Sequence, residues 1–227
     1  MKASERRFDM KVKRRIVSIL VGMLMVFVMM PMVPLMITAF CLKGKGRRMI
    51  LFLLGGMTVC LLSSYISTFL AAFYGASLFT ASLEISPFVE ELMKFLPVLF
   101  YLLVFEPEKR LIADAALLVS AGFATFENAC FLTQNGAANI LQLLIRGFGT
   151  GAMHVVCGVI VAFGLMYLWD RIWIRIAGTL GLLVVAMTYH GIYNILVSQQ
   201  GIPALIGYFI PMATIILFLV YRKEEES

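Results

Sequence analysis

Charged residues are scarce in this chain: only 14% of its 227 residues are Asp, Glu, Lys or Arg, whereas 61% are hydrophobic. A soluble domain is closer to about half apolar and about a quarter charged. Apolar stretches of the roughly 20 residues that a helix needs to cross a bilayer follow one another along the chain. This leaves no room for a sizeable soluble domain, so we expect one membrane domain with short loops and tails.

Several signatures of soluble catalytic and binding proteins are also missing. The four cysteines, Cys41, Cys60, Cys130 and Cys157, show no C-x-x-C spacing, so they indicate neither a disulfide framework nor a cysteine zinc site. The H-E-x-x-H and G-x-S-x-G motifs of hydrolases are absent. The net charge of +6 lies in the N-terminal tail and in short loops. This is the pattern of topogenic charge, so no nucleic-acid partner is expected.

The apolar stretches predict an all-α fold, a polytopic membrane helix bundle of about seven transmembrane helices, because only helices and closed barrels satisfy the backbone in lipid. The predicted spans are residues 16–40, 49–74, 87–105, 111–134, 147–169, 176–198 and 203–221. We expect a basic tail at 1–15, a single helical domain at 16–221 and a charged tail at 222–227.

Basic residues indicate how the spans are oriented. They gather in the loops after spans 1, 3 and 5 and in the C-terminal tail, while Arg146 is alone between spans 4 and 5. Since basic loops stay in the cytoplasm, the C-terminus is expected inside. Seven spans would then place the N-terminus outside, although residues 2–15 hold seven basic side chains. Either span 1 is irregular around Pro31 and Pro34, or the tail is exported against the rule, or the true start lies downstream of Met1.

Ionisable residues interrupt the third span. Each costs about 2.5–3.5 kcal/mol at the bilayer centre, so its presence suggests a function. Glu90, Glu91 and Lys94 follow Pro87 at the start of this span. Lys94 lies one turn after Glu90 and is expected to pair with it. One carboxylate is then available as a general base; an interfacial charge cluster is the alternative.

Spans 4, 5 and 6 each hold further polar groups. Glu127 lies in span 4 with no cation nearby in sequence, so it needs a partner on another helix, a metal ion or a proton. His154 lies in span 5, and His190 shares one helix face with Asn194 in span 6. The chain has two histidines and both are in spans. Purely structural hydrogen bonding is the alternative for each of these groups.

The depth of these groups links them. Consecutive spans run in opposite directions, so the start of spans 3 and 5 and the end of spans 4 and 6 lie on the outer side. At about 1.5 Å per residue, all four groups lie roughly 5–12 Å below the outer surface. A shared layer is expected of a single site.

The residue types fit two hydrolytic schemes. Glu127, His154 and His190 are ligand types of a catalytic zinc site with an open position, and a second glutamate would be the base. In a metal-free scheme, one glutamate and one histidine activate water, while the other histidine and Asn194 donate hydrogen bonds to an oxyanion. The residues alone leave both schemes open.

The order of motifs resembles the PrsW family of bacterial intramembrane proteases, relatives of CAAX prenyl endopeptidases and of bacteriocin-processing membrane proteases. The matching motifs are E-E-x-x-K at 90–94, F-x-x-x-E-N at 123–128, His154, and H-x-x-x-N at 190–194. The CAAX relatives carry a histidine where Glu127 stands, so their detailed mechanism need not transfer.

The resemblance implies a metal-assisted endopeptidase of the bacterial inner membrane. Its substrates would be single-span membrane proteins such as an anti-sigma factor, cut at site 1 on the extracytoplasmic side. By residue, Glu90 or Glu91 would be the base and Lys94 would tune it. Glu127, His154 and His190 would be zinc ligands or partners of water and oxyanion, and Asn194 would support His190 or the oxyanion.

Two other classes of protein are the alternatives. A proton-coupled transporter also uses buried Glu and His residues, but the chain shows no internal repeat and no charge ladder across the whole membrane. A non-catalytic scaffold for single-span partners would not require a complete set of acid, base and imidazole groups.

Overall fold

A computed structural model describes residues 32–105, 108–135, 140–169 and 172–225. The chain divides into two units, Met1–Ile50 and Leu51–Ser227, which are described separately. The described part of the first unit holds a short apolar helix, Met32–Cys41, and the beginning of α2. The tail at 1–15 and most of predicted span 1 lie outside the described residues, so both stay predictions.

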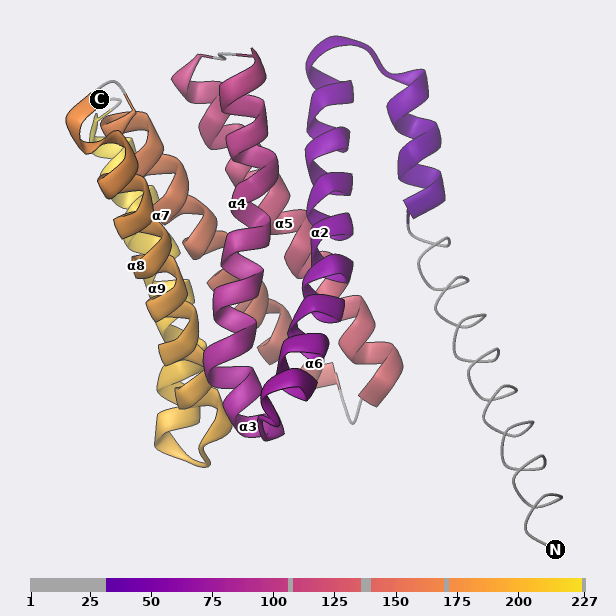
Figure 1. The fold of residues 1–227 in the computed structure, drawn as a ribbon, viewed down its shortest axis with the longest axis vertical. Coiled ribbons are helices and arrows are strands. Elements are labelled where there is room, and N and C mark those ends of the chain that lie inside the picture. The colour runs from indigo at the N-terminus through magenta and orange to yellow at the C-terminus, as the bar shows by residue number, and fades with distance from the viewer. Residues whose placement is uncertain (1–31, 106–107, 136–139, 170–171, 226–227) are drawn as a thin grey trace, which may run out of the picture. The chain divides into compact units, whose positions relative to one another are not determined.

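The second unit is built of helices, and the described residues contain no strand. The elements are α2 (Gly44–Tyr74), α3 (Leu78–Thr80), η1 (Ala81–Ile85), α4 (Ser86–Phe105), α5 (Lys109–Asn135), α6 (Ile140–Arg146), η2 (Gly147–Gly151), α7 (Ala152–Leu168), α8 (Ile172–Ser198) and α9 (Ile202–Glu225). Figure 1 shows α3, α6 and the turn between α8 and α9 at the same end of this unit.

Five helices are long and apolar enough to cross a membrane: Gly44–Tyr74, Arg110–Thr133, Leu143–Leu168, Ile176–Ser198 and Ile202–Val220. The 20-residue α4 lies at predicted span 3; it is not one of these five and carries the charged residues Glu90, Glu91 and Lys94. These helices match predicted spans 2 to 7, and the prediction of an all-α polytopic membrane bundle is confirmed. The helical segment at span 5 begins at Leu143 and not at residue 147 as predicted, because the end of α6 runs through η2 into α7.

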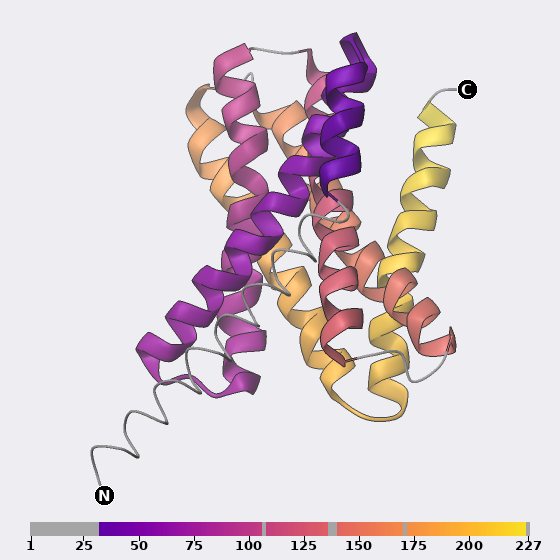
Figure 2. The same cartoon turned by 90° about the vertical axis from the view of Figure 1, so that its right-hand side faces the viewer.

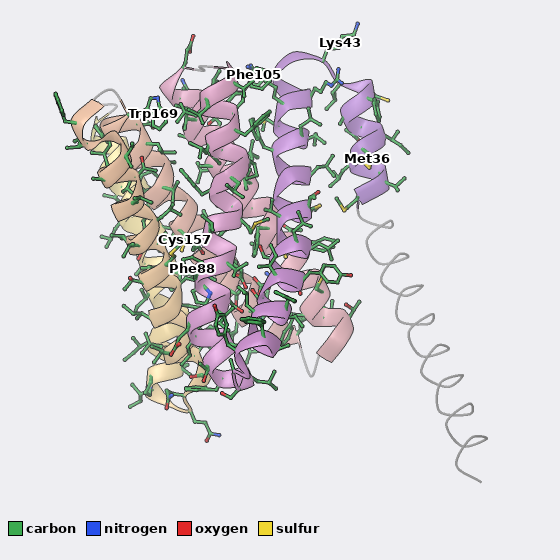
Figure 3. All side chains as sticks on the ribbon, viewed as in Figure 1. Met36, Lys43, Phe88, Phe105, Cys157 and Trp169 are labelled. Atoms are coloured by element: carbon green, nitrogen blue, oxygen red, sulfur yellow. The ribbon has the colours of Figure 1, made fainter. Side chains whose placement is uncertain are left out.

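The outside of the second unit is apolar. Phe88 and Phe105, near the two ends of α4, are 52% and 64% exposed (Figure 3). The interior is formed mainly by α5 and α7, where Phe123, Phe126, Met153 and Leu165 are almost completely buried. Apolar side chains on both sides of the helices are expected where the surroundings are lipid.

Two glycines let α2 approach α5 closely. A Cβ atom at Gly56 would collide with backbone atoms of Val119, and one at Gly122 would collide with the backbone of Leu53. Small residues allow this kind of backbone contact between membrane helices. The part of α2 in the second unit crosses at a slant in the view of Figure 2.

A five-residue π-helical segment precedes each of two long helices. The η1 segment leads into α4, where Pro87 occupies the first turn and needs no N–H partner. The η2 segment leads into α7, two residues before His154. Such insertions are frequent at functional sites. Here both lie directly upstream of predicted site residues.

Candidate active site

Glu91 and Lys94 form a buried ion pair on α4. The Lys94 Nζ atom lies 2.7 Å from Glu91 Oε1, and the two side chains are only 5% and 2% exposed. The expected pairing of Lys94 with Glu90 is therefore wrong. Positions three and four apart are both neighbours on a helix, and here Lys94 contacts Glu91, three positions before it. Glu90, four positions before Lys94, points to the two histidines and has 19% of its side chain exposed.

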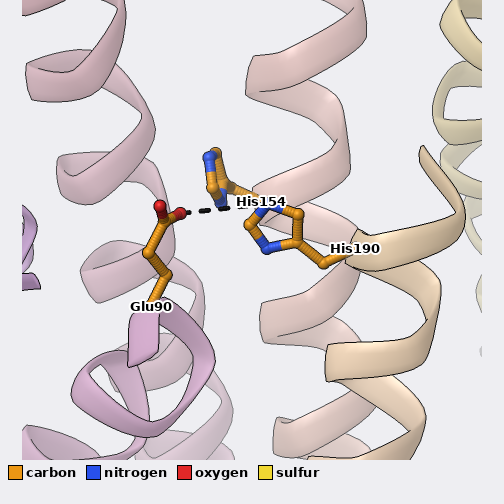
Figure 4. Close-up of side chains that lie close together, drawn as sticks. All are labelled: Glu90, His154 and His190. Atoms are coloured by element: carbon orange, nitrogen blue, oxygen red, sulfur yellow. Dashed lines mark ion pairs between the residues drawn. The ribbon is translucent and has the colours of Figure 1, made fainter. Parts of the chain in front are cut away.

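His190 of α8 joins this pair. Its Nδ1 atom lies 2.7 Å from Glu91 Oε1, the oxygen that also accepts from Lys94. A carboxylate accepts and does not donate, so Nδ1 carries a proton, and in the neutral ring Nε2 is left with a free lone pair. The Nε2 atom lies 3.9 Å from Glu90 Oε2, too far for a direct hydrogen bond (Figure 4).

His154 of α7 lies on the other side of Lys94. Its Nδ1 atom is 3.1 Å from Lys94 Nζ, and its Nε2 atom contacts Glu127 Oε2. The ring is perpendicular to that of His190, with 5.1 Å between centroids. Phe123, the aromatic residue of the F-x-x-x-E-N motif, packs against His154 with 4.9 Å between centroids. The motif therefore places two residues that contact the His154 ring, Phe123 and Glu127, one turn apart on α5.

The cation that pairs with Glu127 lies outside α5. Its second oxygen, Oε1, accepts a hydrogen bond of 2.9 Å from Arg146, the last residue of α6. The guanidinium of Arg146 lies 3.7 Å from the ring centroid of Phe131, which holds it in place. Sequence reasoning did not include Arg146 in the site. Its isolation as a single basic residue on the otherwise bare outer side was a usable signal.

The two asparagines of the motifs, Asn128 and Asn194, differ in their hydrogen bonding. Asn194 lies one turn after His190, and its Nδ2 atom donates a 2.8 Å hydrogen bond to the backbone oxygen of Ser82 in η1. This bond ties α8 to the segment before α4. The Oδ1 atom of Asn128 is buried and has no hydrogen-bond partner among the described residues.

A polar cavity of about 320 Å³ opens beside these groups. Glu90, Glu127, His190 and Asn194 line it, whereas Glu91, Lys94 and His154 are buried and are not among its lining residues. The additional polar lining residues that sequence reasoning missed are Ser82, Ser86, Arg146, Thr150, Tyr193, Ser198 and Tyr208. Glu90 and His190 therefore share one polar cavity that is large enough for several water molecules.

The donor atoms fit a metal ion in type and spacing. Glu90, His154 and His190 each offer one ligand atom, and these atoms lie within 4.8 Å of one another. Two imidazoles and a carboxylate are the ligands of catalytic zinc. The Nδ1 atom of His190 donates to a carboxylate, as metal-bound histidines commonly do. At His154 the Nε2 atom contacts Glu127, so ligation through this atom requires Glu127 to move away. The structure thus groups Glu90, rather than Glu127, with the two histidines, and a ligand role for Glu127 stays a prediction.

An apolar helical bundle that encloses acids and imidazoles beside a polar cavity is compatible with an intramembrane hydrolase. The model of the PrsW family of intramembrane metalloproteases matches residues 45–221, and the chain belongs to this family. The matched region contains every site residue described above. No curated protein and no solved structure matched the chain. The protein is therefore a multi-pass membrane protein and an intramembrane protease.

Proposed function

We propose that the protein cleaves single-span membrane proteins, such as an anti-sigma factor, by site-1 proteolysis near the outer leaflet of a bacterial inner membrane. The observation that carries this proposal is the pair formed by Glu90 and His190. Both side chains line the polar cavity, and neither the Glu90 carboxylate nor His190 Nε2 has a direct hydrogen bond among the described residues. Two unpaired acceptors 3.9 Å apart suit a shared water molecule.

In the proposed reaction Glu90 takes a proton from that water while the water oxygen attacks the carbonyl carbon of the scissile peptide. The carbonyl electron pair moves onto its oxygen. When the tetrahedral species collapses, the C–N bond breaks and the proton on Glu90 passes to the leaving amine. Glu91 is committed to Lys94 and His190, so Glu90 is the better candidate for the base.

Two side chains of the cavity are candidates to stabilise the oxyanion. Asn194 uses one N–H on Ser82 and retains a second one. Arg146 uses its contact with Glu127 and retains further N–H groups at the cavity. Donors held in place before the reaction contribute most when they face the developing charge.

In the metal-assisted alternative Glu90 would be a zinc ligand instead of the base, together with His154 and His190, and the ion would polarise the scissile carbonyl as a Lewis acid. Glu127 would then be free of His154, held by Arg146, and available as the base. We place the C-terminus in the cytoplasm, because the basic loops alternate with bare ones. The site would then lie towards the extracytoplasmic side.

The test is cleavage of a single-span anti-sigma factor by the purified protein in liposomes. Glu90→Gln keeps the size of the side chain and removes the base, so cleavage should fall by about 10²–10⁴-fold. Glu84→Gln is the matched control, since Glu84 is exposed in η1 and is not among the cavity-lining residues. Mass spectrometry of the fragments should place the cut in the outer half of the substrate span. Wild-type rates in Glu90→Gln, or a cut in the cytoplasmic half, would show the proposal to be wrong.

A further inference from the structure

The polar cavity follows one face of α8. The residues of α8 that line it are His190, Tyr193, Asn194, Val197 and Ser198. Positions three and four apart lie on the same face of a helix. The cavity therefore extends along about two turns of α8, from His190 to the last residue of the helix.

The exposure of these side chains rises along the face. His190 and Tyr193 are 3% and 4% exposed. Asn194 is half-buried and Ser198 is exposed, as is Ser82 of η1, which also lines the cavity. The cavity therefore lies deep at its His190 end and reaches the surface at its Ser198 end.

We propose that this cavity binds the extracytoplasmic juxtamembrane segment of the substrate in an extended conformation, with the scissile peptide at Glu90 and His190 and the chain leaving past Ser198. The inference rests on the proposed function, from which it takes the single-span substrate and the orientation of the site. It adds where the substrate lies and which of its residues the protein contacts.

The dimensions of the cavity fit a short extended segment. His190 and Ser198 are eight positions apart, which is roughly 12 Å along a helix. At about 3.3 Å per residue, an extended chain covers this distance with about three to four residues. The volume of about 320 Å³ encloses about two residues at the spacings of neighbouring strands and sheets, so the others lie at the open end.

The lining supplies the hydrogen-bond partners that an extended backbone lacks in lipid. A segment that leaves its helix in the hydrocarbon layer exposes N–H and C=O groups, and each unsatisfied group costs several kcal/mol. The hydroxyl and amide groups that can donate to or accept from such a segment belong to Ser82, Ser86, Asn194 and Ser198. Because these four side chains are uncharged, this part of the cavity favours a polar, uncharged segment over an apolar or a charged one.

The wall formed by Tyr193 and Tyr208 is held in place from η2. The hydroxyl groups of Tyr193 and Thr150 lie 2.9 Å apart. Tyr208 of α9 lies against Gly149, where a Cβ atom would come within 2.5 Å of its ring. The two tyrosine rings are 6.3 Å apart between centroids. A binding site formed before the substrate arrives loses less freedom on binding.

The first test is photocrosslinking in liposomes with a benzophenone amino acid at Ser198. Glu90→Gln in the same chain keeps the single-span substrate uncut, and the wild type defines the position of the cut. Ile195 carries the same group in the control, because it is 46% exposed on α8 and does not line the cavity. Ser198 should crosslink to substrate residues about two to four positions from the cut on its extracytoplasmic side, whereas Ile195 should not.

The second test fills the open end of the cavity. Ser198→Trp adds a large side chain at roughly 12 Å along the helix from His190, so it should obstruct the substrate segment and leave the reacting groups in place. KM should rise by about tenfold or more, while kcat stays close to the wild-type value. Ile195→Trp should change neither.

Crosslinks from Ser198 that reach only the cytoplasmic side of the cut, or no substrate residue, would overturn the inference. An unchanged KM in Ser198→Trp would do the same, and the crosslink decides if that variant does not fold. Crosslinks to the juxtamembrane segment of a protein that the wild type does not cut would leave the inference standing while the proposed function fails. Cleavage without the Ser198 crosslink would have the opposite meaning.

Discussion

Glu91 and His190, 99 positions apart in the chain, are joined by a 2.7 Å hydrogen bond between Oε1 and Nδ1. The same carboxylate oxygen neutralises Lys94, so one buried atom holds together α4 and α8 and sets the direction of the free His190 nitrogen. In the proposed reaction Glu91 is thus a positioning residue, and Glu90 beside it is free to act as the base.

The Glu91–Lys94 pair should be far more important to stability when one partner is removed than when both are. Glu91→Gln leaves a buried ammonium without its counter-charge, at a cost of about 3–5 kcal/mol. The double variant Glu91→Gln with Lys94→Met should be less destabilised than the sum of the two single variants, because no unpaired charge remains. The measurement is thermal unfolding of the four proteins in detergent. Strict additivity would mean that the two side chains do not interact.

Adjacent glycines of α2 should respond oppositely to alanine. Gly56→Ala places a methyl group against the backbone of Val119, which cannot move aside, and should cost about 1–3 kcal/mol. Gly55 has open space beside its Cα, so Gly55→Ala should stabilise the helix by up to about 1 kcal/mol. Unfolding in detergent measures both. Equal effects at the two positions would contradict the close contact of α2 with α5.

Metal content separates the two hydrolytic schemes. If zinc is used, the purified protein should contain about one ion per chain, and chelation should abolish cleavage until zinc returns. Glu90→Gln and His190→Gln should lower the bound zinc, while Cys41→Ser should not, since Cys41 is exposed and outside the ligand group. A protein that contains no zinc and cleaves in the presence of chelator uses the metal-free scheme.

Much of this arrangement was predictable from the sequence, because hydropathy fixes where membrane helices lie and the alternation of directions fixes depth. Depth alone predicts that Glu90, Glu91, Glu127, His154 and His190 share one layer of the membrane. What could not be predicted depends on rotation about the helix axes. Lys94 could reach either glutamate of α4, and only the packed bundle shows that it pairs with Glu91.

The contact of Arg146 with Glu127 could not be predicted for a related reason. It lies at the end of α6, upstream of the irregular segment η2, and periodicity gives no direction for its side chain. The hydrogen bond of Asn194 to a backbone oxygen of η1 is likewise a contact between segments 112 positions apart. No local pattern carries information about such contacts.

Glu90 and His190 are proposed to act on one water molecule in one site. The most direct measurement is the single-turnover rate of substrate cleavage in liposomes for Glu90→Gln, His190→Gln and the double variant. Residues that act as a unit are strongly non-additive. The double variant should therefore be no slower than the slower single variant. A double variant whose loss equals the product of the two single losses, or a single variant with the wild-type rate, would contradict the claim.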